Sequence, residues 1–206
     1  MKLIHLSDLH LGKRVNEFSM IEDQKYILNE ILRIIDKEAP DGVLLAGDLY
    51  DRPIPSAEAV QLFDRFLTQL AERKIPVYAI SGNHDSAVRV NCYRSVLARQ
   101  RLHMIGLPPV QPEEYIEKVV LRDAYGSVNF YLLPFVKPSM VKQVVGVDEN
   151  GNNLSYNETL HRLIGREKIN SDERNVLVSH QFYLPSGKNA EDVERMDSEM
   201  RTVGNI

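Results

Sequence analysis

The stretch Gly82-Asn83-His84-Asp85 decides the fold, because it is one of four polar motifs that each follow a short apolar run. The others are Asp8-Leu9-His10, Gly47-Asp48 and His180. The apolar runs are predicted to be buried strands, and they are Leu3 to Leu6, Val43 to Ala46, Val77 to Ile80 and Val176 to Val178. Ligands collect at the carboxyl ends of strands in a parallel sheet, so we expect the four motifs to meet at one edge of such a sheet.

Helices are predicted between these strands. Apolar residues recur at helical spacing from Met20 to about Glu38, and Pro40-Asp41-Gly42 ends that segment. Ser56 is a candidate N-cap for a second helix. The expected inner face of this second helix comprises Val60, Phe63, Leu67 and Leu70. Alternating strands and helices are typical of a parallel sheet that helices cover.

The pattern changes after a third predicted helix, which runs from about Val88 to Arg101. Two further strands, Ile116 to Leu121 and Val128 to Leu133, predict a hairpin on the other side of the sheet. Its turn is expected at Tyr125-Gly126-Ser127. This hairpin indicates a mixed or two-sheet architecture.

The last third of the chain is assigned from its helix-start and loop signals. Ser155 and Glu158 have the spacing of a capping box, which predicts the start of a helix. Asn175 to Ser179 is the predicted strand that precedes His180. Polar and charged residues dominate from Leu184 to Asp197, which predicts a long exposed loop or a short helix.

The composition is that of a globular protein outside the membrane. The 206 residues suit one domain, with 43% hydrophobic and 26% charged residues. No apolar run approaches the ~20 residues that span a bilayer, and the amino terminus lacks the apolar region of a signal peptide. Cys92 is the single cysteine, which precludes an intrachain disulfide framework. These features predict a reducing, cytoplasmic setting.

The charge balance argues against a protein that binds nucleic acid over its whole surface. Lys and Arg number 25 and Asp and Glu 29, so the formal net charge is −4. A local basic rim is compatible with this balance, because Lys13 and Arg14 follow the first motif, Arg52 the second and Arg89 the third. These four are candidate substrate-binding residues, and the alternative is solvated surface without a function.

The four motifs together predict a centre for two divalent metals. Asp8-Leu9-His10 alone can be a surface turn and Gly47-Asp48 an ordinary turn after a strand, but all of the motifs follow apolar strands in the order that a metal site requires. Carboxylate, amide and imidazole donors without thiolate suit two hard or borderline cations. Such a pair clamps the attacking and leaving oxygens of a phosphoester.

The motifs and their flanking residues also resemble a known family. Residues 1 to about 100, with His180, are similar to the calcineurin-like metallophosphoesterase superfamily. More narrowly, they resemble SbcD-type nuclease subunits of bacterial DNA repair exonucleases, and the stretches that carry this likeness are Ser7-Asp8-Leu9-His10-Leu11-Gly12, Gly47-Asp48-Leu49-Tyr50-Asp51-Arg52-Pro53 and Gly82-Asn83-His84-Asp85-Ser86. The resemblance implies an α/β fold, a two-sheet β-sandwich flanked by helices, over residues 1–206.

The resemblance also implies roles for the motif residues. Asp8 and His10 would hold the first metal, Asp48 would bridge both, and Asn83 and His180 would hold the second. The family's metal is manganese. His84 corresponds to a residue that assists catalysis without being a primary ligand, and from its chemistry it could stabilise or protonate the leaving oxygen.

The expected activity is manganese-dependent exonuclease and endonuclease action on DNA ends and hairpins in repair and recombination. The implied partners are DNA and an SMC-like coiled-coil ATPase of the SbcC type. The resemblance also implies a homodimer that pairs through helices, for which Val60, Phe63, Val96 and Leu97 are candidate contacts.

The sequence departs from the family pattern in one respect. Family members carry a further Gly-His-x-His segment whose histidines complete the two metal shells, and this sequence has no such segment. We therefore expect an amino-terminal fragment that stops before this last ligand motif and before the accessory DNA-binding domain, with weakened metal binding and little or no activity.

Residues beside the motifs are weighed separately. Asp85 either orients a ligand or His84, or caps a helix, and Asp51 is expected to be a solvated loop residue. Cys92 is expected to be a small buried hydrophobe. Packing roles are predicted for the remaining histidines and for two aromatic residues near His180, namely His5, His103, His161, Phe182 and Tyr183.

Two other functions stay open. A phosphoesterase for a small substrate, such as a phosphoprotein or a cyclic nucleotide, would use the same motifs. A non-catalytic binding module, in which the polar residues only organise loops, need bind no metal.

Overall fold

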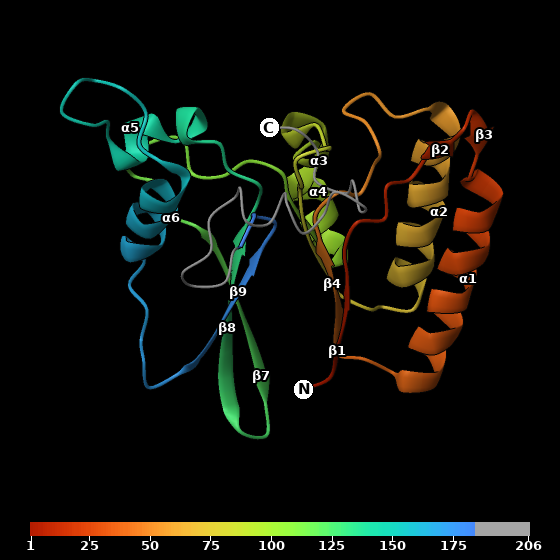
Figure 1. Cartoon of the computed structure of the whole chain (residues 1–206). Coiled ribbons are helices and arrows are strands. Elements are labelled where there is room, and N and C mark those ends of the chain that lie inside the picture. Colours follow the sequence, from red (N-terminus) through yellow and green to blue (C-terminus); the bar gives the residue numbers. More distant parts are fainter. Residues whose placement is uncertain (184–206) are drawn as a thin grey trace.

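The computed structural model of the chain describes residues 1–183 (Figure 1). The predicted loop or short helix from Leu184 to Asp197 lies outside these residues. Four parallel strands form the first sheet, in the order β1-β4-β5-β6, and they are β1 (Leu3–Leu6), β4 (Gly42–Ala46), β5 (Val77–Ile80) and β6 (Leu102–Ile105). The first three confirm the predicted strands, whereas β6 was not predicted.

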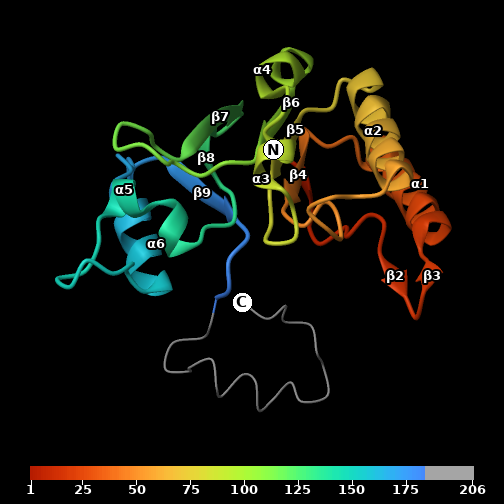
Figure 2. The ribbon, with the colours of Figure 1, turned by 90° about the horizontal axis from the view of Figure 1, so that it is seen from above.

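Two long helices cover one face of this sheet, as predicted (Figure 2). They are α1 (Ile21–Glu38) and α2 (Ala57–Glu72). The apolar stripe of α1 buries Leu28, Leu32 and Ile35. Ser56 is the N-cap of α2, because its Oγ accepts the Ala59 N–H at 3.2 Å. The predicted inner face of α2 is wrong at Val60, which is 43% exposed.

The second sheet contains three strands, in the order β7-β8-β9, and they are β7 (Glu117–Asp123), β8 (Gly126–Leu133) and β9 (Arg174–Ser179). β7 and β8 form the predicted antiparallel hairpin, and β9 runs parallel to β8. The prediction that all four motifs follow strands of one parallel sheet is therefore wrong for His180, which follows β9. A short apolar run does not reveal which sheet it joins, because any buried strand reads the same way.

The two sheets pack face to face, which confirms the predicted two-sheet architecture. Their shared core contains residues from both sheets, namely Leu44, Ala46, Tyr78, Ile80, Ile105, Val128, Phe130, Leu132 and Val178. Burying these side chains is the main force that holds the sheets together. The motif loops after β1, β4, β5 and β9 thus come from both halves of one sandwich.

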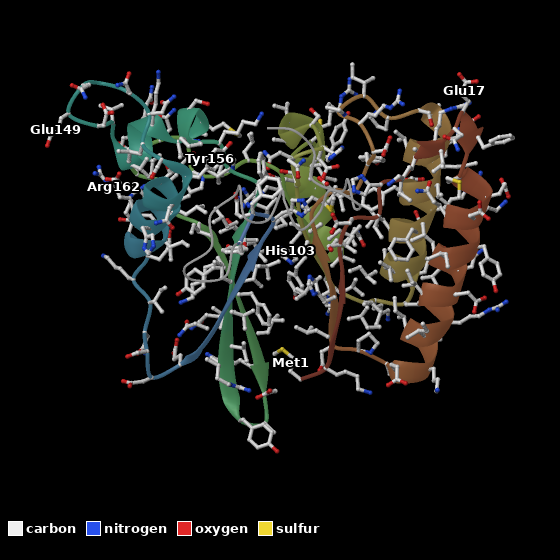
Figure 3. All side chains as sticks on the ribbon, in the orientation of Figure 1. Met1, Glu17, His103, Glu149, Tyr156 and Arg162 are labelled. Atoms are coloured by element: carbon white, nitrogen blue, oxygen red, sulfur yellow. The ribbon has the colours of Figure 1, made fainter. Side chains whose placement is uncertain are left out.

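A second helical layer covers the outer face of the second sheet. It contains α5 (Lys142–Val145) and α6 (Tyr156–Gly165), with η2 (Pro138–Met140) before α5. Ser155 caps α6 as predicted, since its Oγ accepts the Glu158 N–H at 3.2 Å. Figures 1 and 2 show α1 and α2 on one side of the molecule and α5 and α6 on the other, so the order of layers is helix, sheet, sheet, helix. In Figure 3, Glu17, just before α1, and Arg162, on α6, lie on these opposite sides.

The predicted third helix, Val88 to Arg101, is wrong as a continuous element. The segment divides into α3 (Ala87–Val90), α4 (Arg94–Leu97) and η1 (Ala98–Gln100). Tyr93 has φ +59°, a left-handed conformation that a continuous α-helix does not allow. Cys92 lies in this break and is exposed, so its predicted burial is also wrong.

A small hairpin extends from the first motif. It comprises β2 (Arg14–Val15) and β3 (Phe18–Ser19), and all four of its strand residues are exposed. Within residues 1–183, no helix has both the length and the apolar character needed to span a membrane.

Candidate metal centre

The first two motif loops lie side by side through backbone hydrogen bonds. Asp8 N–H donates to Gly47 O at 3.1 Å, and His10 N–H donates to Asp48 O at 3.0 Å. Asp8, His10 and Asp48 have φ values of +56°, +43° and +50°. The prediction that Asp8 and His10 share one side of an extended chain is therefore wrong in its geometry, because both residues adopt the left-handed conformation.

Two glycines permit the loops to approach this closely. A Cβ at Gly82 would lie 2.1 Å from Asp48 Oδ1, and a Cβ at Gly47 would lie 2.4 Å from His180 Nδ1. Gly47 also has φ +92°, which favours glycine. The glycines of the Gly-Asp and Gly-Asn-His-Asp motifs thus make room for the side chains that carry the chemistry.

Asp48 is the centre of the site. It is 2% exposed, and its Oδ2 faces three imidazoles, at 3.6 Å from His10 Nε2, 4.0 Å from His84 Nε2 and 3.5 Å from His180 Nε2. Its Oδ1 accepts the His84 backbone N–H at 2.9 Å. Two groups of potential ligands share this carboxylate, and they are His10, Asp48 and His84, and Asp8, Asp48 and His180. The bridging role of Asp48 stays a prediction.

His180 reaches the centre from the second sheet. Its Nδ1 lies 2.7 Å from Ala46 O, and its Nε2 lies 3.2 Å from Asn83 Oδ1. A carbonyl oxygen only accepts, so Nδ1 carries the proton and the neutral ring presents the Nε2 lone pair to the oxygens of Asn83 and Asp48. Acceptor atoms that face one another in this way need a shared cation or proton.

His84 shows the same orientation. Its Nδ1 lies 3.2 Å from Asp51 O, and its ring meets the His10 ring edge to face with 4.9 Å between centroids. Asp8 lies between the two groups, because its Oδ1 is 3.8 Å from His10 Nε2. The structure thus brings together the predicted residues Asp8, His10, Asp48, Asn83, His84 and His180. The distance from His84 Nε2 to Asp48 Oδ2 is similar to the distances from the candidate ligands His10 and His180. Distance therefore does not separate His84 from the ligands, and its catalytic role stays a prediction.

Asp85 fastens the second and third motif loops to each other. Its carboxylate accepts the N–H groups of Gly82 at 2.9 Å, Tyr50 at 2.9 Å and Leu49 at 3.1 Å. It is not a helix cap, because Ser86 is the N-cap of α3. Asp85 therefore orients the ligand loops, which is one of the two roles that the sequence left open.

Asp51 is not the solvated loop residue that the sequence predicted. Its side chain is only 20% exposed, and its Oδ1 lies 3.7 Å from His10 Nδ1. Its backbone oxygen faces His84 Nδ1. The spacing of Asp48 and Asp51 carried no signal for this arrangement, which depends on the fold of the loop after β4.

The pKa values of the two buried carboxyl groups are shifted in opposite directions. Burial raises the pKa of Asp48, but the hydrogen bond with His180 and the His84 N–H together outweigh it, so the pKa of Asp48 lies below its usual value. Burial also raises the pKa of Asp85, and the three N–H donors do not overcome it. Burial lowers the pKa of His180, yet Asp48 reverses the effect and the net pKa is raised. Without a metal, the Asp48 carboxylate thus favours a proton on His180.

The donor set fits two divalent cations. Carboxylate and imidazole dominate the two groups, the amide oxygen of Asn83 is within reach, and the Nε2 atoms of three rings face one carboxylate. The Nδ1 atoms of His84 and His180 face carbonyl oxygens, as the outward nitrogens of metal-binding histidines do.

The remaining candidates are four basic residues and two histidines. Lys13, Arg14, Arg52 and Arg89 are exposed; Arg52 Nε lies 3.6 Å from Asp51 Oδ2. The packing role of His103 is confirmed, because it stacks on Tyr78 with 5.2 Å between ring centroids. His161 is exposed on α6.

The aromatic residues after β9 lie beside the centre. Phe182 meets the Phe135 ring edge to face at 6.3 Å, and the hydroxyls of Tyr183 and Ser179 lie 2.7 Å apart. Both residues line a pocket with His5, Asp8 and His180. The predicted packing is present in part for Phe182, which contacts Phe135 but is 44% exposed, and it is wrong for Tyr183, which is 62% exposed. His5 is exposed rather than packed.

Comparison with known proteins agrees with this geometry. The family model described as calcineurin-like phosphoesterase matches residues 1–197. The chain belongs to this family. The family resemblance stated from the motifs is therefore confirmed, as is the fold class.

Two relatives are similar over most of the chain. The SbcD subunit of nuclease SbcCD from Staphylococcus epidermidis is 32% identical over 194 residues, which cover 93% of this chain and 49% of that protein. The corresponding SbcCD nuclease subunit from Staphylococcus saprophyticus is 30% identical over 183 residues, which cover 87% of this chain and 46% of that protein. The chain thus spans about half the length of the curated relatives it matches.

Proposed function

We propose that the chain is the nuclease domain of a manganese-dependent DNA exonuclease and endonuclease, which processes DNA ends and hairpins in repair and recombination. The observation that carries this proposal is the convergence of three imidazole Nε2 atoms on Asp48 Oδ2 in a phosphoesterase fold. The names of the two relatives favour DNA as the substrate.

The proposed mechanism assigns a role to each side chain. Asp8, His10 and Asp48 would hold one manganese ion, and Asp48, Asn83 and His180 the other. Two such ions, when bound, lower the pKa of a water and neutralise charge on the phosphoryl oxygens. Asp85 keeps the loops after β4 and β5 in register, so that Asp48 and Asn83 stay together.

His84 would act on the leaving oxygen. Its Nδ1 proton is engaged by Asp51 O, so Nε2 of the neutral ring accepts a hydrogen bond and donates one only after the ring is protonated. The imidazolium form is therefore the proposed acid. This assignment predicts that the rate falls when His84 loses its charge.

The substrate test compares DNA with a small diester. In the presence of manganese, the protein should cleave linear and hairpin oligonucleotides far faster than bis-p-nitrophenyl phosphate. Replacing Arg52 and Arg89 by alanine should weaken DNA cleavage and leave the small diester unaffected, because both residues are exposed basic side chains that follow ligand motifs in the sequence. Hydrolysis of only the small diester would favour a small-substrate phosphoesterase, and absence of metal binding by calorimetry would favour a binding module.

The proposed partners are DNA, an SMC-like coiled-coil ATPase and a second copy of the chain. Of the four candidate dimer contacts, Val60 and Val96 are 43% and 63% exposed and are available to a partner. Phe63 is buried and Leu97 packs on the core, so these two are corrected to core residues. Sedimentation at high micromolar concentration, with Val60→Asp and Val96→Asp as variants, tests the homodimer.

The proposal also includes two further imidazole ligands from a Gly-His-x-His segment. This segment does not occur in the sequence. A polypeptide that carries this chain followed by such a segment should bind manganese more tightly than residues 1–206 alone. Equal affinities would show that the additional imidazoles are not ligands of this centre.

A further inference from the structure

Gln24 lies on the buried face of α1, where the other residues are apolar. Leu28 and Leu32 are buried on this face, and one step of four residues toward the amino terminus leads to Gln24. Gln24 is half-buried. A carboxamide in such a position needs hydrogen-bond partners, because an unpaired polar group that leaves water is unfavourable.

The first motif loop, residues 8–12, supplies these partners. Gln24 Nε2 donates to Leu9 O at 3.2 Å and to His10 O at 2.8 Å, and Gln24 Oε1 accepts the Gly12 N–H at 2.9 Å. Both protons and the oxygen of the carboxamide are thus used. Because two of the partners accept and the third donates, they also determine which way the carboxamide faces.

The backbone of this loop is unfavourable by itself. Asp8, His10 and Gly12 have φ values of +56°, +43° and +88°. Asp8 and His10 carry a Cβ, so the left-handed conformation is strained at both residues. Backbone hydrogen bonds to the second motif loop hold one side of the first loop, and Gln24 holds the other side.

The fold keeps Gln24 in a fixed place beside the loop. The Met20 N–H donates to Lys13 O at 3.0 Å, so the β2–β3 hairpin closes between the loop and the start of α1 (Figure 1). The Gln24 N–H donates to Met20 O at 2.9 Å, which places Gln24 one turn into the helix. Leu28, one turn further, is 3% exposed and anchors this end of α1 in the core.

We infer that Gln24 is a positioning residue for the metal that Asp8 and His10 would hold, because it fixes the strained backbone that directs both side chains into the site. The inference rests on the proposed metal centre and does not depend on DNA as the substrate. Loss of an outer contact of this kind commonly weakens metal binding by about 10- to 100-fold. The metal that Asn83 and His180 would hold should be affected far less, since Gln24 does not bind their loops.

The first test needs no metal and uses the wild-type protein. NMR should show slow solvent exchange for the Gln24 carboxamide protons and the Gly12 amide proton, and fast exchange for the carboxamide of Gln61, which is exposed on α2. Gln24→Met keeps the length of the side chain but removes its polar atoms, so the Gly12 amide should lose its protection. A Gln24 carboxamide that exchanges as fast as that of Gln61 would overturn the inference, even if every variant failed to fold.

The second test is manganese binding by calorimetry. Gln24→Met should weaken one of the two manganese sites by about 10- to 100-fold and leave the other nearly unchanged. Gln61→Met is the matched control, because it makes the same substitution at an exposed position of α2 and should leave both sites unchanged. Unchanged affinity in Gln24→Met, or equal weakening of both sites, would contradict the inference.

Two background variants assign the effect to one site. With Asn83→Ala, the site of Asp8 and His10 keeps its ligands, so adding Gln24→Met should weaken the remaining binding. With Asp8→Asn, that site is already impaired, and adding Gln24→Met should have little further effect. The same weakening in both backgrounds would mean that Gln24 supports the whole fold and does not position one ligand loop. Failure to cleave DNA, with exchange and affinities as expected, would instead contradict only the proposed function.

Discussion

The Asp85 carboxylate accepts the Tyr50 N–H at 2.9 Å and thereby joins two ligand loops that are 35 residues apart. Two further N–H groups, of Leu49 and Gly82, bind the same carboxylate. We predict that Asp85→Ala lowers the free energy of unfolding by about 2 to 4 kcal/mol, because it leaves these donors without an acceptor. Urea denaturation measures this loss.

Asp85→Asn provides the graded comparison. The amide retains one oxygen that can accept, so this variant should lose less stability than Asp85→Ala. Both variants should also weaken manganese binding, because Asp48 and Asn83 lie on the loops that Asp85 joins. A variant that keeps wild-type stability and affinity would show that other contacts hold the loops together.

Asp48 and His84 are expected to have different roles. Asp48→Asn should weaken both manganese sites at once, because its carboxylate belongs to both ligand groups. His84→Ala should spare metal binding and lower turnover by about 10²- to 10⁴-fold, as expected for loss of a general acid. Calorimetry with manganese, paired with turnover on DNA, separates these outcomes. Equal loss of manganese in both variants would refute the division of roles.

The glycine before Asn83 offers a steric test of the site. Gly82→Ala places a Cβ where Asp48 Oδ1 would be only 2.1 Å away, so the carboxylate must move. We expect manganese affinity to fall by at least about 10-fold. Gly165→Ala is the control, because a Cβ there meets no atom within 4 Å. If calorimetry gives equal affinities for the two variants, the position of Asp48 is not critical.

His103 should make stability depend on pH. Burial lowers the pKa of His103, Glu117 opposes this shift, and Arg94 adds to it, with a net decrease. The unfolded chain therefore binds a proton more readily than the folded chain, and stability should fall as pH drops through and below the usual histidine value of about 6.5.

Urea denaturation at pH 7.5 and pH 5.5 checks this expectation. His103→Gln should reduce the difference in stability between the two pH values. His161→Gln should leave it unchanged, because His161 is exposed on α6. An equal pH dependence in wild type and His103→Gln would assign the effect to other groups.

Local patterns in the sequence predicted the parts of the fold that local forces determine. The strands before Asp8, Asp48 and Asn83 are short and apolar, and Ser56 and Ser155 cap the helices that they were predicted to cap. The places of the candidate ligand residues could be predicted for the same reason, since each follows a short strand directly.

The errors concern contacts between distant segments. Nothing in the apolar run before His180 distinguishes a strand beside β8 from one beside β1. The left-handed Tyr93 interrupts a segment whose composition favours a helix. Asp51 reads as a polar loop residue, because its neighbour His10 lies 41 positions earlier in the sequence and meets it only in the folded loop.

The origin of His180 in the second sheet has a consequence for the dynamics of the sandwich. A cation held jointly by His180 and by Asp48 of the first sheet would act as a crosslink between the halves, and it would oppose their separation by its binding free energy. Amide protons of β8 and β9 should then exchange more slowly with solvent when manganese is present, whereas those of α1 should change little. Slower amide exchange at the junction of the two sheets would thus report that metal occupies the site.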